Sequence, residues 1–358
     1  MQFASLLSSG LAVAVVLSLA GCAALTDSSA GAVDSRTVAV GLYPLEYVAA
    51  RVAGDAFEVT NLTTPGGEPH DLTLNLRETA VVADAALLVY VGSLQPSIDD
   101  AAEEVAEGEV LDAASVVGLL PFDDGHGHEE HADEEHAAEE HADEEHAAEE
   151  HADEEHSAEE HADEEHSAEE HSAEEHSDEE HEGHDHGEDD PHFWQDPLRM
   201  ADLGDAIAER LAEIDPDGAE TFEANAADLR ADLEALDQEY ATGLGDCAIT
   251  TVVTNHDAFG YLEKYGLHLE SITGISPDAE PSPATLVHLQ DLIEDDGITT
   301  VFSESLVSAK SAQTLASDVG VRTEVLDTVE GLTDETADED YLSLMRHNLA
   351  KLEEANRC

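Results

Sequence analysis

Three histidines in this 358-residue chain stand where metal or ligand sites are commonly built. His70 ends the loop Pro65-Gly66-Gly67-Glu68-Pro69-His70, which follows a predicted strand. His256 directly follows another predicted strand, and His192 begins a predicted helix in Pro191-His192-Phe193-Trp194. Imidazole nitrogens are frequent ligands of zinc and related metals. The pattern indicates a metal site, although a single histidine at a strand end is more often a hydrogen-bonded structural residue.

A second set of histidines lies in a low-complexity segment. Fifteen occur between Gly125 and His186, and they recur every five residues from His131 to His181, mostly as His-Ala-Asp-Glu-Glu. Five residues advance a helix by about 500°, so the histidines share no face, and no apolar stripe is present to be buried. We therefore expect residues 123–190 to form a disordered His- and Asp/Glu-rich loop.

This loop could hold many weak, exchangeable zinc sites, because each imidazole is flanked by carboxylates. Such a loop would collect metal ions near a tighter site, and its capture would fade below about pH 6 as the histidines become protonated. The alternative interpretation is a solvated acidic linker.

Alternating strand and helix patterns surround the three separate histidines and predict an α/β fold. Residues 36–122 begin with strands at 36–40, 57–62 and 86–91, separated by helices at 44–53 and 76–83. Residues 245–358 repeat this rhythm, with strands at 248–254, 269–272, 298–302 and 322–326 and helices at 258–265, 282–295, 309–319 and 341–356. The rhythm predicts two lobes, each with a mainly parallel sheet flanked by helices.

Two helices are predicted between the lobes. Residues 197–214 form one, and residues 191–215 as a whole complete the first lobe. The second, at about 217–242 within a linker at 216–244, would be nearly 40 Å long and could brace the two lobes. Ligands of open parallel sheets bind beyond the carboxyl ends of the strands, where His70 and His256 are expected to lie.

Taken in order, Pro69-His70-Asp71, Pro191-His192-Phe193-Trp194 and Asn255-His256-Asp257-Ala258-Phe259-Gly260-Tyr261 resemble the motifs of one protein family. They are similar to the zinc and manganese cluster of ABC-transporter solute-binding proteins, over roughly residues 36–358. The acidic His-rich loop lies where zinc-binding members carry theirs. The resemblance implies two α/β lobes joined by a long rigid helix, with the metal ion between the lobes.

The resemblance also implies a ligand set. His70, His192 and His256 match the three family histidines, and a carboxylate after the last strand falls on Asp327, with water as the alternative fourth ligand. Glu304 matches a position that supports the ligands. Some zinc members place a Glu directly before the first histidine, where this chain has Pro69. Members that bind manganese commonly have Glu in place of His256, so Zn²⁺ is favoured over Mn²⁺.

The N-terminus carries a targeting signal. The apolar run Leu11–Ala20 is too short for a normal membrane span, and it leads into Leu19-Ala20-Gly21-Cys22, which resembles a bacterial lipobox. We expect residues 1–21 to be a lipoprotein signal peptide, Cys22 to carry the lipid and residues 22–35 to form a tether. A plain secretory signal with an incidental Cys is the alternative. No Lys or Arg precedes the apolar run, so the usual basic n-region is missing.

Two cysteines remain, Cys247 and Cys358. In an exported protein they are expected to form one disulfide, and two free thiols are the alternative.

The formal net charge of −74 excludes nucleic acid as a partner, because phosphates would be repelled.

Together, the histidines, the targeting signal and the family resemblance predict a monomeric, non-enzymatic receptor, anchored by lipid at the cell surface or in the periplasm. It would capture Zn²⁺ and deliver it to an ABC permease and its ATPase. A manganese-specific homologue and a metal buffer or adhesin are alternatives. An exported zinc hydrolase is another, although the chain has neither a His-Glu-x-x-His nor a Gly-x-Ser-x-Gly motif.

Overall fold

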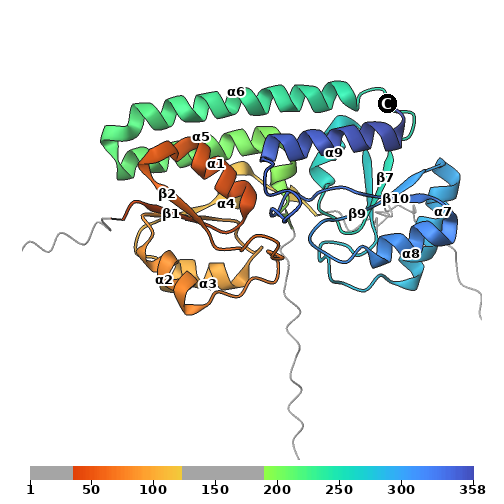
Figure 1. The fold of residues 1–358 in the computed structure, drawn as a ribbon, viewed down its shortest axis with the longest axis horizontal. Helices are drawn as coiled ribbons and strands as arrows, with labels where there is room; N and C mark the ends of the chain where they lie inside the picture. The colour runs from red at the N-terminus through yellow and green to blue at the C-terminus, as the bar shows by residue number, and fades with distance from the viewer. Residues whose placement is uncertain (1–34, 123–188) are drawn as a thin grey trace, which may run out of the picture. The chain divides into compact units, whose positions relative to one another are not determined.

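The computed structural model describes residues 35–122 and 189–358 (Figure 1). Two four-stranded parallel sheets organise them, one in each half of the chain. The signal peptide, most of the tether, Cys22 and nearly all of the His-rich loop lie outside the described residues. The predicted α/β class with two parallel sheets is confirmed.

The first sheet has the strand order β2-β1-β3-β4. Its strands are β1 (Thr37–Val40), β2 (Glu58–Asn61), β3 (Leu87–Tyr90) and β4 (Glu109–Asp112). Successive residues of a strand face opposite sides, and β1 is buried on both. Val38 and Val40 pack in the core beneath one helical layer, whereas Ala39 packs in a separate core on the other face.

Helices cover both faces of this sheet (Figure 1). The core on one face includes residues of α1 (Tyr43–Ala53), α4 (Ala113–Val117) and α5 (Pro197–Ile214), and the other includes α2 (Leu76–Asp84) and α3 (Pro96–Glu104). The bounds of α5 match the prediction, because Asp196 accepts a hydrogen bond from the Leu198 amide as N-cap and Pro197 fits the first turn.

The second sheet has the order β10-β9-β7-β8. Its strands are β7 (Thr251–Thr254), β8 (His268–Ser271), β9 (Thr300–Ser303) and β10 (Arg322–Val325). Val253 and Val301 face a core shared with α7 (Pro283–Asp296) and α8 (Lys310–Val319). Val252 and Phe302 face the larger core, which includes α9 (Tyr341–Asn356).

The long helix α6 (Ala219–Gly243) contacts elements of both halves. It packs against α1 and α5 of the first half and against α9 of the second, as Figure 1 shows. Its buried residues Phe222, Leu229, Leu233, Leu236 and Tyr240 belong to one continuous core that reaches both sheets. The predicted long connecting helix is therefore present.

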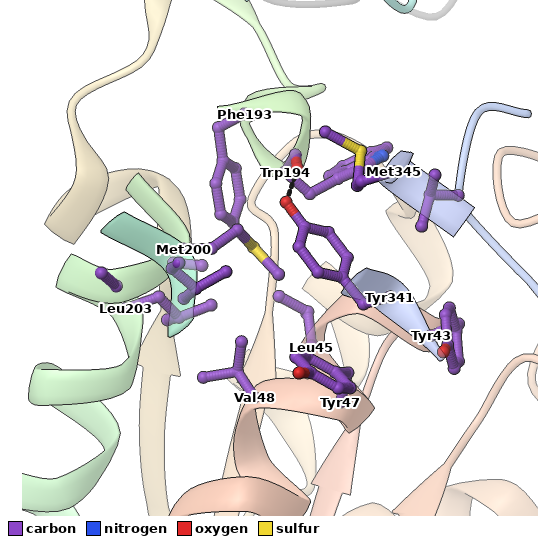
Figure 2. Packing of buried hydrophobic residues seen from close by; sticks show 14 of the residues in the cluster. Tyr43, Leu45, Tyr47, Val48, Phe193, Trp194, Met200, Leu203, Tyr341 and Met345 are labelled. Atoms are coloured by element: carbon purple, nitrogen blue, oxygen red, sulfur yellow. Dashed lines mark hydrogen bonds between the residues drawn. The ribbon is translucent and has the colours of Figure 1, made fainter. Parts of the chain in front are cut away.

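A second link between the halves is the contact of Tyr341 with the segment around Trp194 (Figure 2). The Tyr341 hydroxyl donates a 2.6 Å hydrogen bond to the Trp194 carbonyl oxygen, and its ring stacks on Tyr47 with centroids 5.3 Å apart. Met200 and Leu203 of α5 lie in the same cluster. This packing fixes the chain directly after His192.

Three expectations differ from the structure in detail. Residues 258–265, expected to be α-helical, contain a 3₁₀ helix at Gly260–Tyr265. Asp189–Asp190, expected to end the acidic loop, form β6 and pair with β5 (Leu120–Pro121). The elements α3, β4 and α4 had not been assigned from the sequence. The pairing of 120–121 with 189–190 shows that regular structure extends almost to both ends of the segment 123–188.

Cys247 and Cys358 are joined by a disulfide, which closes a segment with a sequence separation of 111. The described residues contain no helix that combines the length and the hydropathy needed to cross a bilayer.

Candidate metal centre

Four side chains from distant parts of the chain meet at one point. His70, His192, His256 and Glu330 each offer one ligand atom, and these atoms all lie within 4.8 Å of one another. Nε2 of His70 lies 3.4 Å from Nε2 of His192. Oε1 of Glu330 lies 3.6 Å from Nε2 of His192 and 3.7 Å from Nε2 of His70 and of His256.

Both halves of the molecule contribute to this group. His70 lies in the loop after β2, and His192 lies between β6 and the 3₁₀ turn Phe193–Gln195. His256 follows β7 by two residues, and Glu330 follows β10 by five. The two strand-end histidines therefore lie beyond the carboxyl ends of parallel strands, which is where ligands of such sheets bind.

The spacing of the donor atoms fits a tetrahedral ion. Ligands about 2.0–2.1 Å from zinc, arranged tetrahedrally, lie about 3.3–3.4 Å from each other. Four of the six donor-to-donor distances are 3.4–3.7 Å, which is slightly longer than that value and too long for good hydrogen bonds, and all six are within 4.8 Å. Moreover, Nε2 of His256 and Oε1 of Glu330 are buried without any hydrogen-bond partner. Buried polar atoms without a partner are costly, so this pair indicates a ligand between them.

Two carboxylates orient the histidines from behind. Nδ1 of His256 lies 2.7 Å from Oε2 of Glu304, and the His256 amide donates to the other oxygen of the same carboxylate. Nδ1 of His192 lies 2.8 Å from Oδ1 of Asp190, which also accepts from the His192 amide. These contacts favour the tautomer with a proton on Nδ1, which leaves Nε2 free to bind a metal ion.

Burial and neighbouring charge set the protonation of the site. Burial alone would lower the pKa of His256, but Glu304 and Glu330 outweigh it and raise the pKa to about 10. Burial opposes ionisation of Glu330, yet His256 and His70 hold its pKa well below its usual range. Burial lowers the pKa of His192 despite its contact with Asp190. The ion-free site thus holds a carboxylate facing a protonated His256.

His70 is less firmly held than the other two histidines. Its Nδ1 is buried without a hydrogen-bond partner, and no carboxylate orients the ring from behind, because Oε1 of Glu68 accepts from the His70 backbone amide instead, at 3.1 Å. Burial and the nearby Glu330 raise the pKa of Glu68 to about 7. Glu68 does not belong to the group of four donors.

The fourth donor in the structure is Glu330, where the sequence had suggested Asp327 or water. Asp327 is absent from the donor group. One of its oxygens accepts from the Val329 amide at 2.8 Å and the other from the Ser305 hydroxyl at 3.1 Å. Asp327 is the first carboxylate after β10, but the chain runs three residues further before a carboxylate, that of Glu330, reaches the imidazoles. The sequence carries one feature that points to Glu330 as a ligand: it is an acidic residue between an apolar residue, Val329, and a small one, Gly331.

A tyrosine of the second half contacts both chain segments that flank the His-rich loop. The Tyr261 hydroxyl donates to the Asp190 carbonyl oxygen at 2.7 Å and accepts from the Leu120 amide at 3.0 Å. Since Asp190 orients His192, these contacts help to fix a candidate ligand.

The remaining histidines within the described ranges are exposed, as expected. His268 and His288 have side-chain exposures of 59% and 61%, and each lies near Glu270. His347 is also exposed, on α9.

A family model described as zinc-uptake complex component A, periplasmic, matches residues 38–355. The chain belongs to this family. Members of the zinc-uptake component A family are substrate-binding receptors rather than enzymes.

Curated relatives agree with this placement. The zinc-binding lipoprotein AdcA of Streptococcus pneumoniae serotype 4 is 31% identical over 320 residues, which cover 87% of this chain and 54% of AdcA. The high-affinity zinc uptake system protein ZnuA of Bacillus subtilis is 38% identical over 166 residues, covering 46% of this chain and 53% of ZnuA. The chain thus spans about half the length of the curated relatives it matches.

Solved structures show the same fold. The Zn(II)-bound ZnuA-like domain of Streptococcus pneumoniae AdcA has a TM-score of 0.64 and 27% identity, covering 90% of this chain and all of that domain. Zn(II)-bound AdcA of the same organism gives a TM-score of 0.65 with 28% identity, covering 90% of this chain and 58% of AdcA.

Proposed function

We propose that this protein captures Zn²⁺ through His70, His192, His256 and Glu330 and delivers it to an ABC-type permease. The observation that carries the proposal is the set of four donor atoms, three imidazole nitrogens and one carboxylate oxygen, all within 4.8 Å of one another. Such a set completes the preferred coordination of zinc without any further ligand.

Zinc is favoured over manganese by the chemistry of these donors. Three neutral imidazoles and one carboxylate suit Zn²⁺, whereas Mn²⁺ prefers more oxygen ligands in octahedral geometry. The matched relatives named for zinc support the same choice.

The four-donor coordination fits a protein that captures a zinc ion rather than one that uses it for catalysis. A catalytic zinc keeps one position open for an activated water, but here four protein donors would occupy all four positions. An exported zinc hydrolase therefore has no support from the site.

The location and the partners follow as part of the same proposal. A lipid on Cys22 would anchor the protein at the outer face of the cytoplasmic membrane, next to the permease, and the ATPase would drive transport from the cytoplasmic side. The His-rich segment would act as a collector that raises the local zinc concentration. The described residues do not include either feature.

The proposal is tested by counting bound zinc. The full chain, a variant lacking residues 126–186, and the same deletion with His70→Ala, His192→Ala and His256→Ala would be analysed for metal content after dialysis against a zinc buffer. We expect one tight zinc in the deletion variant and none in the triple substitution.

His347→Ala, at an exposed position, is the matched control and should retain the ion. Equal zinc in the deletion variant with and without the triple substitution would refute the site. Equal total zinc in the full chain and the deletion variant would remove the collector role.

A further inference from the structure

Asp327 does not face the metal group, yet it is almost fully buried at 6% exposure. Oδ1 of its carboxylate accepts from the Val329 amide two residues ahead, at 2.8 Å, and thereby closes a tight turn. Oδ2 accepts from the Ser305 hydroxyl at 3.1 Å. Both oxygens are therefore used to hold the turn that precedes Glu330.

Val329, the residue before Glu330, has a left-handed backbone conformation with φ = 61°. Left-handed conformations are rare for β-branched residues, because the branched side chain crowds the backbone. Val329 is also fully buried, at 0% exposure. A conformation of this kind persists only where the surroundings enforce it, and the bond from the Val329 amide to Asp327 is the local contact that does so.

The backbone around this turn is held from both halves of the molecule. Asn348 of α9 makes two hydrogen bonds with the Asp327 backbone, of 2.9 and 2.6 Å. From the first half, Trp194 Nε1 and Gln195 Nε2 donate to the Thr328 carbonyl oxygen at 2.9 and 2.7 Å. The Tyr43 amide donates to the Glu330 carbonyl oxygen at 3.3 Å.

The contacts of the Glu330 Oε1 with the three imidazoles, in contrast, are long, at 3.6–3.7 Å. This Oε1 has no hydrogen-bond partner, so its position among the imidazoles depends on the backbone that carries it. A change in the turn at Val329 would move Glu330 away from the three Nε2 atoms.

We propose that Asp327 is a positioning residue for zinc capture, which holds the left-handed turn at Val329 and so places Glu330 among the three histidines. This inference rests on the proposed zinc-binding function. It assigns to Asp327 a role other than direct ligation.

A double-mutant cycle separates these roles. Asp327→Ala, Glu330→Ala and the double variant would be made in the full chain. Zinc affinity would be read from the fluorescence of Trp194, the single tryptophan, whose ring centroid lies 5.2 Å from that of His192. This signal reports the site rather than the His-rich segment, and chelator-buffered zinc would set the free concentration.

We expect Asp327→Ala to weaken zinc binding about 10- to 100-fold, as for other residues that orient ligands. In the Glu330→Ala background the same change should alter the affinity by less than about threefold, since the two residues act through one contact. An equal loss in both backgrounds would overturn the inference and assign independent action, such as ligation, to Asp327. No loss in either background would also overturn it.

A second pair of variants distinguishes the loss of Glu330 positioning from a general loss of folding. Asp327→Asn keeps the oxygen that accepts from Val329 and should bind zinc within a few fold of the wild type. Val329→Gly adopts a left-handed conformation without strain, so it should restore much of the affinity lost in Asp327→Ala. Failure of Val329→Gly to restore affinity in a folded double variant would contradict the proposal.

Asp334→Ala, at an exposed position in the following loop, is the matched control and should bind as the wild type does. Different results would refute the proposed zinc-binding function itself: no zinc binding by the wild type, or an unchanged zinc affinity in Glu330→Ala.

Discussion

Both oxygens of the Glu304 carboxylate contact His256, one through the ring Nδ1 at 2.7 Å and the other through the backbone amide at 2.8 Å. The two residues are 48 positions apart in the sequence and follow different strands of the second sheet. This double contact fixes both the rotation of the imidazole and the position of its backbone. A ligand that is held in this way needs little rearrangement when the ion arrives.

Glu304→Gln should therefore weaken zinc binding about 10- to 100-fold, because the amide orients the ring less well and does not increase its basicity. The Trp194 fluorescence titration measures this effect. Glu324→Gln, at an exposed position on β10, provides a control with the same chemical change. Equal affinities for both variants would show that the contact with His256 is dispensable.

Zinc binding should release protons near neutral pH. His256 is protonated in the ion-free site because its pKa is about 10, and it must be neutral to bind the ion through Nε2. For each proton that zinc displaces, the zinc affinity should increase by up to about tenfold for every unit by which the pH rises between 6 and 9. Affinities at a series of pH values, read from Trp194, test the slope, and a flat profile over this range would contradict it.

Zinc should stabilise the protein against unfolding, because only the folded chain brings the four donors together. At a free zinc concentration 100 times the dissociation constant, the free energy of unfolding should rise by about 2.7 kcal/mol. Thermal denaturation with and without a chelator measures the change. Manganese at the same free concentration should give a smaller shift, and an equal shift would argue against zinc selectivity.

Replacing Cys247 and Cys358 by Ser should destabilise the protein without changing its zinc affinity. The disulfide spans a sequence separation of 111, for which the chain-entropy model gives about 4–5 kcal/mol of unfolding free energy. Neither cysteine belongs to the donor group. Denaturant unfolding and the Trp194 titration test the two parts, and an unchanged midpoint would show that the bond contributes little.

Sequence patterns predicted the fold best where local signals were strong. The helix at Tyr341–Asn356 begins after Asp340, whose side chain caps the Ser343 amide, and its bounds agree with the prediction. The segment 258–265 was less predictable, because its apolar residues fit a helix while Gly260 lowers helical propensity, and it forms a 3₁₀ turn instead.

The candidate site was predictable only in part. His70, His192 and His256 stood out because each follows a strand or begins a helix in a recognisable motif, and the structure brings them together. Glu330 could not be found in this way, because its position depends on a left-handed turn at Val329. Valine rarely adopts a left-handed conformation, so the sequence does not predict this turn. Asp327 was expected from the family resemblance, but it is absent from the donor group and accepts from the Val329 amide in the turn before Glu330.

The pairing of Leu120–Pro121 with Asp189–Asp190 has a consequence for how this gene can change. The segment 123–188 is preceded and followed by these paired strands, so five-residue units can be gained or lost within it without shifting His192. The number of histidine units can therefore change while the ion-binding residues stay in register.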